Sequence, residues 1–236
     1  MNKLNLDVNF TIKISFIMLI LMSSNPVIAQ VIGEVVRSEN MQDYPVGTKI
    51  NEQTEIQTGS NQRIAIKTVD GGVMVAGNNA KIKIVKPGFF SHLFGKIYYF
   101  FKKEKREQVT IQTPTATIGI RGTKFIIDSE DNTDSEKVSL VEGQLNFDAK
   151  DDQYFELYEQ RELNEFELFK LEQQAEFNEY KEQIMEEFVA FKKSIELDQG
   201  NALVFDGNKV TQTPLDDSVF EEITEFEQFL NDNSWQ

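Results

Sequence analysis

Residue types that many enzymes use for catalysis are scarce in this sequence. Its 236 residues include no cysteine and a single histidine, His92. Without cysteine there are no thiol nucleophiles or disulfides, and one histidine gives no basis for a Ser-His-Asp triad or a multi-histidine metal site. Carboxylates are abundant, so a hydrolase that works with a pair of acids stays open as an alternative. We expect no catalytic residues, no metal and no cofactor.

One acidic loop has the spacing of metal ligands. Oxygen-bearing side chains alternate along it at Asp128, Glu130, Asn132 and Asp134, which is typical of the start of a calcium loop. The usual central glycine and distal glutamate are missing. Thr133 and Ser135 fit a plain hairpin loop, which is the interpretation that we favour.

A second candidate is Arg121, which is flanked by Gly119 and Gly122. Two glycines so close together indicate a bulge or a close backbone approach. Pro114, upstream of them, cannot donate to a strand ladder, so it starts or edges a strand. The guanidinium of Arg121 either contacts a ligand or closes a β-turn internally on carbonyls or a carboxylate. We favour the internal clasp.

Aromatic and basic residues interleave between Phe89 and Lys103. The candidate ligand contacts for an envelope polymer or protein are Lys96, Tyr98, Lys102 and Lys103. The alternative is a pair of core strands with a charged loop, since alternation turns half of these aromatics inward. We favour that alternative.

These residues must be positioned by β-structure. From Gln30 to Lys150 about ten short strands fit, separated by turn signals such as Asp70-Gly71. Many short strands favour a sandwich or a solenoid-like sheet. Residues 200–236 predict one more hairpin, over 202–213, and a short C-terminal helix with Phe220, Ile223, Phe226 and Leu230 on one face. The predicted fold is mostly β.

Residues 151–199 predict a long inserted amphipathic helix. They contain no glycine or proline, with Asp152 as a candidate N-cap and Gly200 at the end. Four eleven-residue repeats place aromatics at the first and fourth positions, which gives a nearly straight stripe. We favour one continuous helix over an antiparallel pair, and we expect homo-oligomers. The self-association residues would be Phe177, Tyr180, Ile184, Phe188, Phe191 and Ile195.

The first 29 residues predict a cleaved signal peptide. Lys3 and Lys13 precede a short apolar run, and Val27-Ile28-Ala29 offers a cleavage site. The mature chain would begin at Gln30 and be periplasmic or secreted, and the alternative is an uncleaved N-terminal anchor. No other segment has the roughly 20 apolar residues that a membrane-spanning helix needs.

The charge distribution argues against nucleic acid as a partner. Residues 31–110 carry 12 basic and 8 acidic side chains, whereas residues 151–199 carry 5 and 15, and residues 200–236 carry 1 and 8. A nucleic-acid-binding surface needs clustered positive charge, and this acidic C-terminal half lacks it.

The segment Thr113–Phe125 resembles the signature of the FecR-type domain. Its motif residues here are Thr113, Pro114, Gly119, Arg121, Gly122 and Thr123. Thr58-Gly59, Asp70-Gly71 and Val141–Leu145 resemble further segments of that family, so the resemblance covers about residues 31–149. The best-known members are inner-membrane proteins that relay iron-siderophore signals to a sigma factor. The resemblance implies their extracytoplasmic domain alone.

Together these observations predict a non-catalytic, exported module for binding, assembly or accessory signalling in the bacterial envelope. Its partners would be an envelope protein or polymer and further copies of itself. The alternative is a carboxylate-based hydrolase acting on envelope polysaccharide, and a cleft that holds two buried acids would favour it.

Overall fold

The computed structural model describes residues 30–102, 109–158 and 189–231. The predicted signal peptide and the centre of the predicted inserted helix lie outside these ranges. The chain divides into two units, Met1–Gln30 and Val31–Gln236, and every described helix and strand belongs to the second. No described helix is long and apolar enough to cross a membrane.

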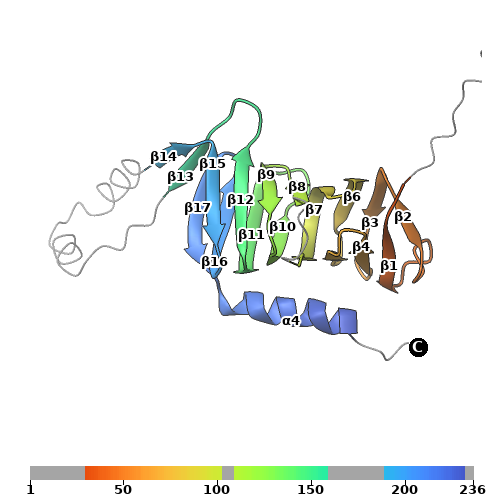
Figure 1. The fold of residues 1–236 in the computed structure, drawn as a ribbon. Helices are drawn as coiled ribbons and strands as arrows, with labels where there is room; N and C mark the ends of the chain where they lie inside the picture. Colours follow the sequence, from red (N-terminus) through yellow and green to blue (C-terminus); the bar gives the residue numbers. More distant parts are fainter. Residues whose placement is uncertain (1–29, 103–108, 159–188, 232–236) are drawn as a thin grey trace, which may run out of the picture. The chain divides into compact units, whose positions relative to one another are not determined.

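The described residues form seventeen strands and one helix, which confirms the mostly β prediction (Figure 1). Hydrogen bonds link all the strands into one mixed sheet that folds into two layers, A and B. Layer A contains, from edge to edge, β2 (Lys49–Asn51), β1 (Val31–Glu39), β4 (Arg63–Thr68), β5 (Val73–Ala76), part of β7 (Phe89–Phe100), β10 (Lys124–Ser129), β11 (Ser135–Glu142), β16 (Asn201–Asp206), β17 (Lys209–Pro214), β13 (Phe155–Tyr158) and β14 (Val189–Lys192). Layer B contains β3 (Thr54–Gln57), β6 (Lys81–Lys86), the rest of β7, β8 (Val109–Gln112), β9 (Ala116–Ile120), β12 (Gln144–Ala149) and β15 (Ser194–Asp198).

Strand β7 joins the two layers. Its first part pairs with β6 and β8 in layer B, and from Gly95 onward it pairs with β5 and β10 in layer A. Gly95 has φ +86°, and a Cβ added there would lie 2.4 Å from the Cα of Ala80. A residue with a side chain would be strained and would clash at this crossing, so glycine is required.

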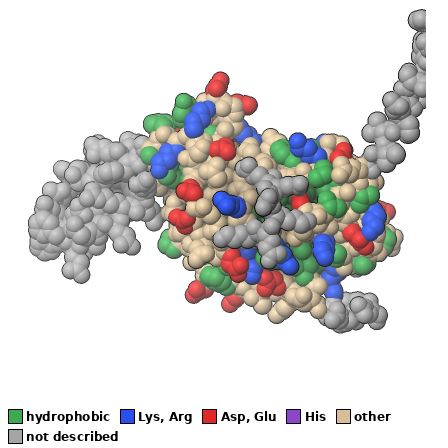
Figure 2. All heavy atoms as spheres, viewed as in Figure 1, with side chains coloured by type: hydrophobic (Ala, Val, Ile, Leu, Met, Phe, Trp, Pro, Cys, Tyr) green, Lys and Arg blue, Asp and Glu red, His purple; other side chains and the backbone are tan. Residues whose placement is uncertain are grey.

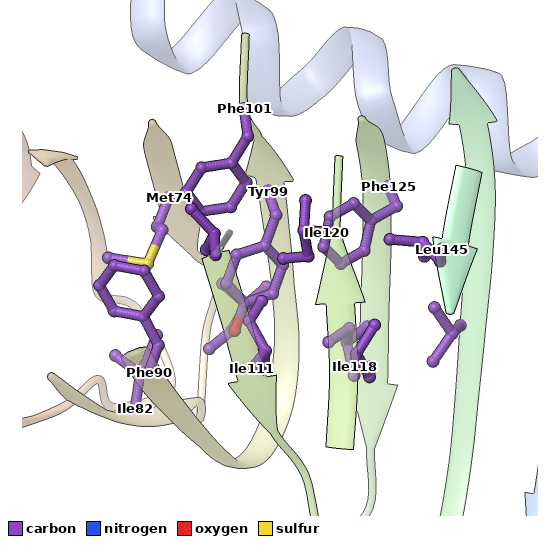
Figure 3. Packing of buried hydrophobic residues seen from close by; sticks show 14 of the residues in the cluster. Met74, Ile82, Phe90, Tyr99, Phe101, Ile111, Ile118, Ile120, Phe125 and Leu145 are labelled. Atoms are coloured by element: carbon purple, nitrogen blue, oxygen red, sulfur yellow. The ribbon is translucent and has the colours of Figure 1, made fainter. Parts of the chain in front are cut away.

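The main hydrophobic core lies between the layers (Figure 3). Tyr99 and Phe125 of layer A stack with ring centroids 5.1 Å apart, and both meet aliphatic side chains such as Ile111 and Ile118 from layer B. Alternation along each strand turns these side chains inward. The same core continues through Phe155, Leu197 and Phe205, so the strands after residue 150 complete the sandwich that the earlier strands begin.

The long helix predicted over residues 151–199 is wrong at both ends. Strands β13 and β14 pair antiparallel, with Tyr158 opposite Val189, and β15 follows at once. Phe155 and Leu157, like Ile195 and Leu197, are buried at every second residue. This period-two pattern is present in the sequence, but the eleven-residue repeat hides it, and short apolar runs are ambiguous between helix and strand.

The prediction for the C-terminal end is confirmed in its main features. The hairpin is β16–β17, and it turns at Gly207 with φ +61°. The helix is α4 (Asp217–Asn231), but it buries Val219 and Phe229 together with Ile223 and Phe226. Phe220, predicted on the inner face, is 49% exposed, so the buried stripe is rotated from the predicted one.

Candidate functional site

The most elaborate polar arrangement in the described chain surrounds Glu136 on β11. This side chain is 2% exposed. Its Oε1 accepts hydrogen bonds of 2.9 Å from the hydroxyls of both Thr113 and Thr115, and its Oε2 accepts one of 2.9 Å from Ser129. Three hydroxyl donors thus meet one buried carboxyl group.

The two threonines are positioned by the tight connection between β8 and β9. The amide of Thr113 donates to the Ala116 carbonyl over 2.9 Å, and the Ala116 amide donates back to the Thr113 hydroxyl over 3.1 Å. Pro114, which has no N–H to satisfy, lies between the threonines, and the Lys150 ammonium donates to its carbonyl over 2.6 Å. The Thr-Pro-Thr segment therefore ties the β8–β9 turn to β11.

Burial governs the electrostatics of this cluster. It raises the pKa of Glu136, although the three hydroxyls and the Lys150 charge oppose the shift. Burial also lowers the pKa of Lys150, against the attraction of Glu136 and of Asp134 and Asp151. Because both oxygens of Glu136 are occupied by protein donors inside the core, this carboxyl group is built to hold structure together rather than to meet a substrate.

Arg121 does not supply the internal clasp that the sequence predicts for it. It follows β9 as an exposed side chain and makes no hydrogen bond or ion pair with the described residues. The backbone does approach closely at one of the neighbouring glycines, as predicted. A Cβ on Gly143 would lie 2.3 Å from the Gly122 carbonyl oxygen. The clasp is made by Thr113, Thr115 and Glu136.

Two of the predicted ligand contacts lie beneath helix α4. Lys96 donates to Glu222 over 2.7 Å and lies 3.3 Å from Asp128. Tyr98 is 1% exposed, and its hydroxyl donates to Glu227 over 3.1 Å. Lys102 is exposed at the end of β7, and Lys103 lies outside the described residues.

Some of the aromatic residues between Phe89 and Phe101 lie in the main core, whereas Phe89, Phe94 and Phe100 are only partly buried. Phe90, Tyr99 and Phe101 are buried in the main cluster. His92 is buried beside them, with its Nδ1 3.0 Å from the Tyr99 hydroxyl and its Nε2 without a hydrogen-bond partner. Burial lowers the pKa of His92 to about 3, and the Gly95 backbone offsets only part of this, so the ring is neutral at physiological pH.

The acidic loop after β10 borders a shallow open pocket of about 380 Å³. Leu93, Phe94 and Pro114 line it together with Lys81 and loop residues 130–134. The carboxylates of that loop are exposed, and among the described residues no cluster of acidic or histidine side chains is arranged to hold a metal ion. The Glu130 amide donates to the Ser135 carbonyl over 3.1 Å, which is the geometry of a hairpin loop.

The residues predicted for self-association are not brought together in the described chain. Phe177, Tyr180, Ile184 and Phe188 lie outside it. Phe191 is 70% exposed on the edge strand β14, whereas Ile195 is 4% exposed on β15, opposite Phe147 in the core. Ile195 therefore has no free side chain to offer a partner.

Sequence reasoning missed Glu136 and Lys150. A signal for Glu136 existed, since it shares a strand face with Val138 and Leu140, both of which are buried. A charged residue at an inward position of an alternating strand indicates a buried polar cluster. Lys150 gave no comparable signal, because its contact with Pro114 joins residues 36 positions apart in the sequence.

Comparison with known proteins assigns part of the chain to a family. The family described as FecR protein matches residues 54–146, a range that contains Glu136 and the Thr-Pro-Thr segment. Two crystal structures of a protein from Parabacteroides distasonis ATCC 8503, provisionally assigned as an anti-sigma factor, resemble the chain with a TM-score of 0.48 and 10% identity. The similarity covers 74% of this chain and 64% and 65% of the length of those chains.

No curated protein sequence matches the chain significantly. The family match and the motif geometry coincide: the turn that carries Thr113 and Thr115, its buried partner Glu136 and the glycine pair Gly122 and Gly143 all lie inside the matched range. Residues 54–146 of this chain are a FecR domain.

Proposed function

We propose that this chain is a non-catalytic binding module of the bacterial envelope, which acts in assembly or accessory signalling by recognising another envelope component. The observation that carries the proposal is the inward placement of the family motif: Thr113 and Thr115 direct their hydroxyls to Glu136, in the interior. Because these motif hydroxyls bond inside the protein, a partner would be recognised by residues on the outer surfaces of the domain.

The outer face of layer B, which the one described helix does not cover, is the first such surface. Its strands alternate, so that Gln112 and Asn146 point outward while their neighbours fill the core. The face is acidic at the β12–β15 end, with Asp148 and Glu196, whereas at the β3–β6 end Lys83 lies opposite Glu55 and Lys81 pairs with that same carboxylate. This uneven charge along one face would orient a partner.

A photo-crosslinking experiment tests this surface. A photoreactive phenylalanine analogue is placed at Gln112 or Asn146 in the full chain, and at Thr211 on the outer side of layer A as the matched control. We expect one discrete protein or polymer adduct in cells from the two layer B positions and none from Thr211. Equal labelling at all three positions, or no adduct at the layer B positions, would refute the interface.

We further propose that the protein is exported and begins at Gln30, in the periplasm or outside the cell. The basic start, the short apolar run and the small residues before Gln30 support this. Intact-mass measurement of the protein from fractionated cells tests it. A full-length mass in the membrane fraction would contradict export with cleavage.

A further inference from the structure

Helix α4 packs on the outer face of layer A and forms a small cluster of its own. Four side chains of the helix, Val219, Ile223, Phe226 and Phe229, meet the outward residues of β4, β5, β7 and β10. Those outward residues are Ala65, Val75, Tyr98 and Ile126. This cluster is separate from the main core between the layers, so the two hydrophobic units are distinct.

Stacked rings fix the register of the helix on this face. Phe226 stacks on Tyr98 with centroids 5.8 Å apart and an interplanar angle of 12°. At the far end, the guanidinium carbons of Arg63 and Arg37 lie 4.6 and 5.2 Å from the centre of the Phe229 ring. Cation–π contacts of this kind select an aromatic side chain at that position.

Basic residues of the sheet flank the apolar strip and pair with the acidic helix. Lys96 pairs with Glu222 at 2.7 Å and Lys124 with Glu227 at 3.0 Å. Figure 2 shows acidic and basic side chains side by side along the edge of the molecule where α4 runs. Burial alone would lower the pKa of Lys96 and Lys124, yet their carboxylate partners raise both pKa values, so both ammonium groups stay charged.

The helix lies outside the main core and pairs with no strand. It caps its own start, where the Ser218 amide donates to the Asp216 carboxylate over 2.9 Å, and it follows β17 after a two-residue connection, Leu215-Asp216. A segment held by one small apolar cluster and partly exposed ion pairs opens locally more easily than the main core does. Its departure would leave the main core between the layers in place.

We infer that the outer face of layer A under α4 is a docking groove for an acidic amphipathic helix of a partner protein, and that α4 is its resident competitor. The groove specifies apolar residues at the spacing of Val219, Ile223, Phe226 and Phe229, with glutamates at the spacing of Glu222 and Glu227. This surface is separate from the layer B face proposed above and does not depend on it.

A peptide with the sequence of residues 216–231 is the direct probe. Labelled with fluorescein, it is titrated with the full chain and followed by anisotropy. The wild-type chain is expected to bind weakly, because the tethered α4 competes at high effective concentration. A chain carrying Ile223→Ser and Phe226→Ser should bind the peptide at least tenfold more tightly. Phe220→Ser, on the exposed side of the same helix, is the matched control and should behave as wild type.

Charge reversal tests the register. A peptide carrying Glu222→Lys and Glu227→Lys should bind the double variant at least tenfold more weakly than the wild-type peptide. Adding Lys96→Glu and Lys124→Glu to that chain should restore binding of the reversed peptide, which a purely apolar contact would not do.

Three results would overturn the inference. The first is no peptide binding by a double variant that thermal unfolding shows to be folded. The second is equal binding by the wild-type and double-variant chains. The third is a concentration-dependent dimer of the wild-type chain that Ile223→Ser with Phe226→Ser abolishes, which would assign the groove to a second copy. None of these outcomes alters the expected crosslinks on layer B, so the two proposals fail separately.

Discussion

The FecR domain and the C-terminal strands that complete the sandwich differ in what they bury. In the described chain, every buried polar or charged side chain lies within the matched range 54–146, including His92, Glu136 and the motif threonines. The strands and helix after residue 146 bury apolar side chains only, from Phe147 and Phe155 to Phe229. The matched range is thus partly polar inside, whereas the strands and the helix that follow it are apolar inside.

This difference separates two ways of specifying strand arrangement. Buried hydrogen bonds such as those to Glu136 have directional requirements, so they penalise alternative registers more than apolar contacts do. The C-terminal strands are specified by alternation and pairing, which tolerate sequence change as long as the pattern persists. Single-residue variants in each half test this difference.

Removing the central carboxyl group should give the largest loss. We expect Glu136→Ala to lower the free energy of unfolding by about 3–5 kcal/mol, because it leaves three buried hydroxyls without their acceptor. Glu136→Gln, which keeps one acceptor oxygen, should cost less. Urea denaturation measures both. Glu196→Ala, at an exposed position of β15, is the control, and an equal effect of the two alanine variants would show that the polar cluster does not stabilise the fold.

The apolar half should respond to volume. Ile195→Ala is expected to cost about 2–5 kcal/mol, since it opens a cavity opposite Phe147. Phe191→Ala, four residues away and 70% exposed, should change the free energy by less than about 0.5 kcal/mol. Thermal unfolding of the two variants measures both losses of stability. Similar losses would show that Phe191 stabilises the fold as much as the buried Ile195 does.

The polar half should show an unusual pH dependence. The folded pKa of His92 is lowered from 6.5 to about 3, so the unfolded chain binds the extra proton first as pH falls below 6.5. Its contribution to stability is therefore lost at up to about 1.4 kcal/mol per pH unit, or roughly 2 kcal/mol by pH 5.

Glu136 acts with the opposite sign. Because its folded pKa is raised above 4.5, the folded chain takes up that proton first, and stability rises as pH falls through the raised pKa toward 4.5. Denaturant midpoints measured from pH 7 to pH 4 test both effects. His92→Leu should reduce or reverse the loss of stability between pH 7 and pH 4. An unchanged loss would show that His92 is not buried as a neutral ring.

Arg121 should give the smallest effect on stability. Because its side chain is exposed and has no partner among the described residues, Arg121→Ala is expected to change the free energy of unfolding by less than about 0.5 kcal/mol. A loss of layer B crosslinks in that variant, with unchanged thermal unfolding, would make Arg121 a binding residue. A loss above about 1 kcal/mol would return it to a structural role.

Local rules within the sequence were enough to predict part of the fold. Alternation and turn residues predicted the β-rich body, the hairpin that turns at Gly207 and the C-terminal helix, and the Thr-Pro motif marked the FecR domain. These features depend on residues near one another in the chain. The candidate site was predicted in part: Thr113 and Pro114 were singled out, and Arg121 was given the role that Glu136 performs.

The remaining features depend on pairing with distant strands, which local patterns do not specify. Phe155–Tyr158 becomes a strand through its parallel partner β17, and Ser194–Asp198 through β12, although both lie in a segment rich in helix formers. Glu136 meets Thr113 across 23 residues of sequence, and Lys96 meets Glu222 across 126. Intrinsic helix propensity is a weak preference, so strand pairing and the burial of apolar side chains in the folded chain override it here.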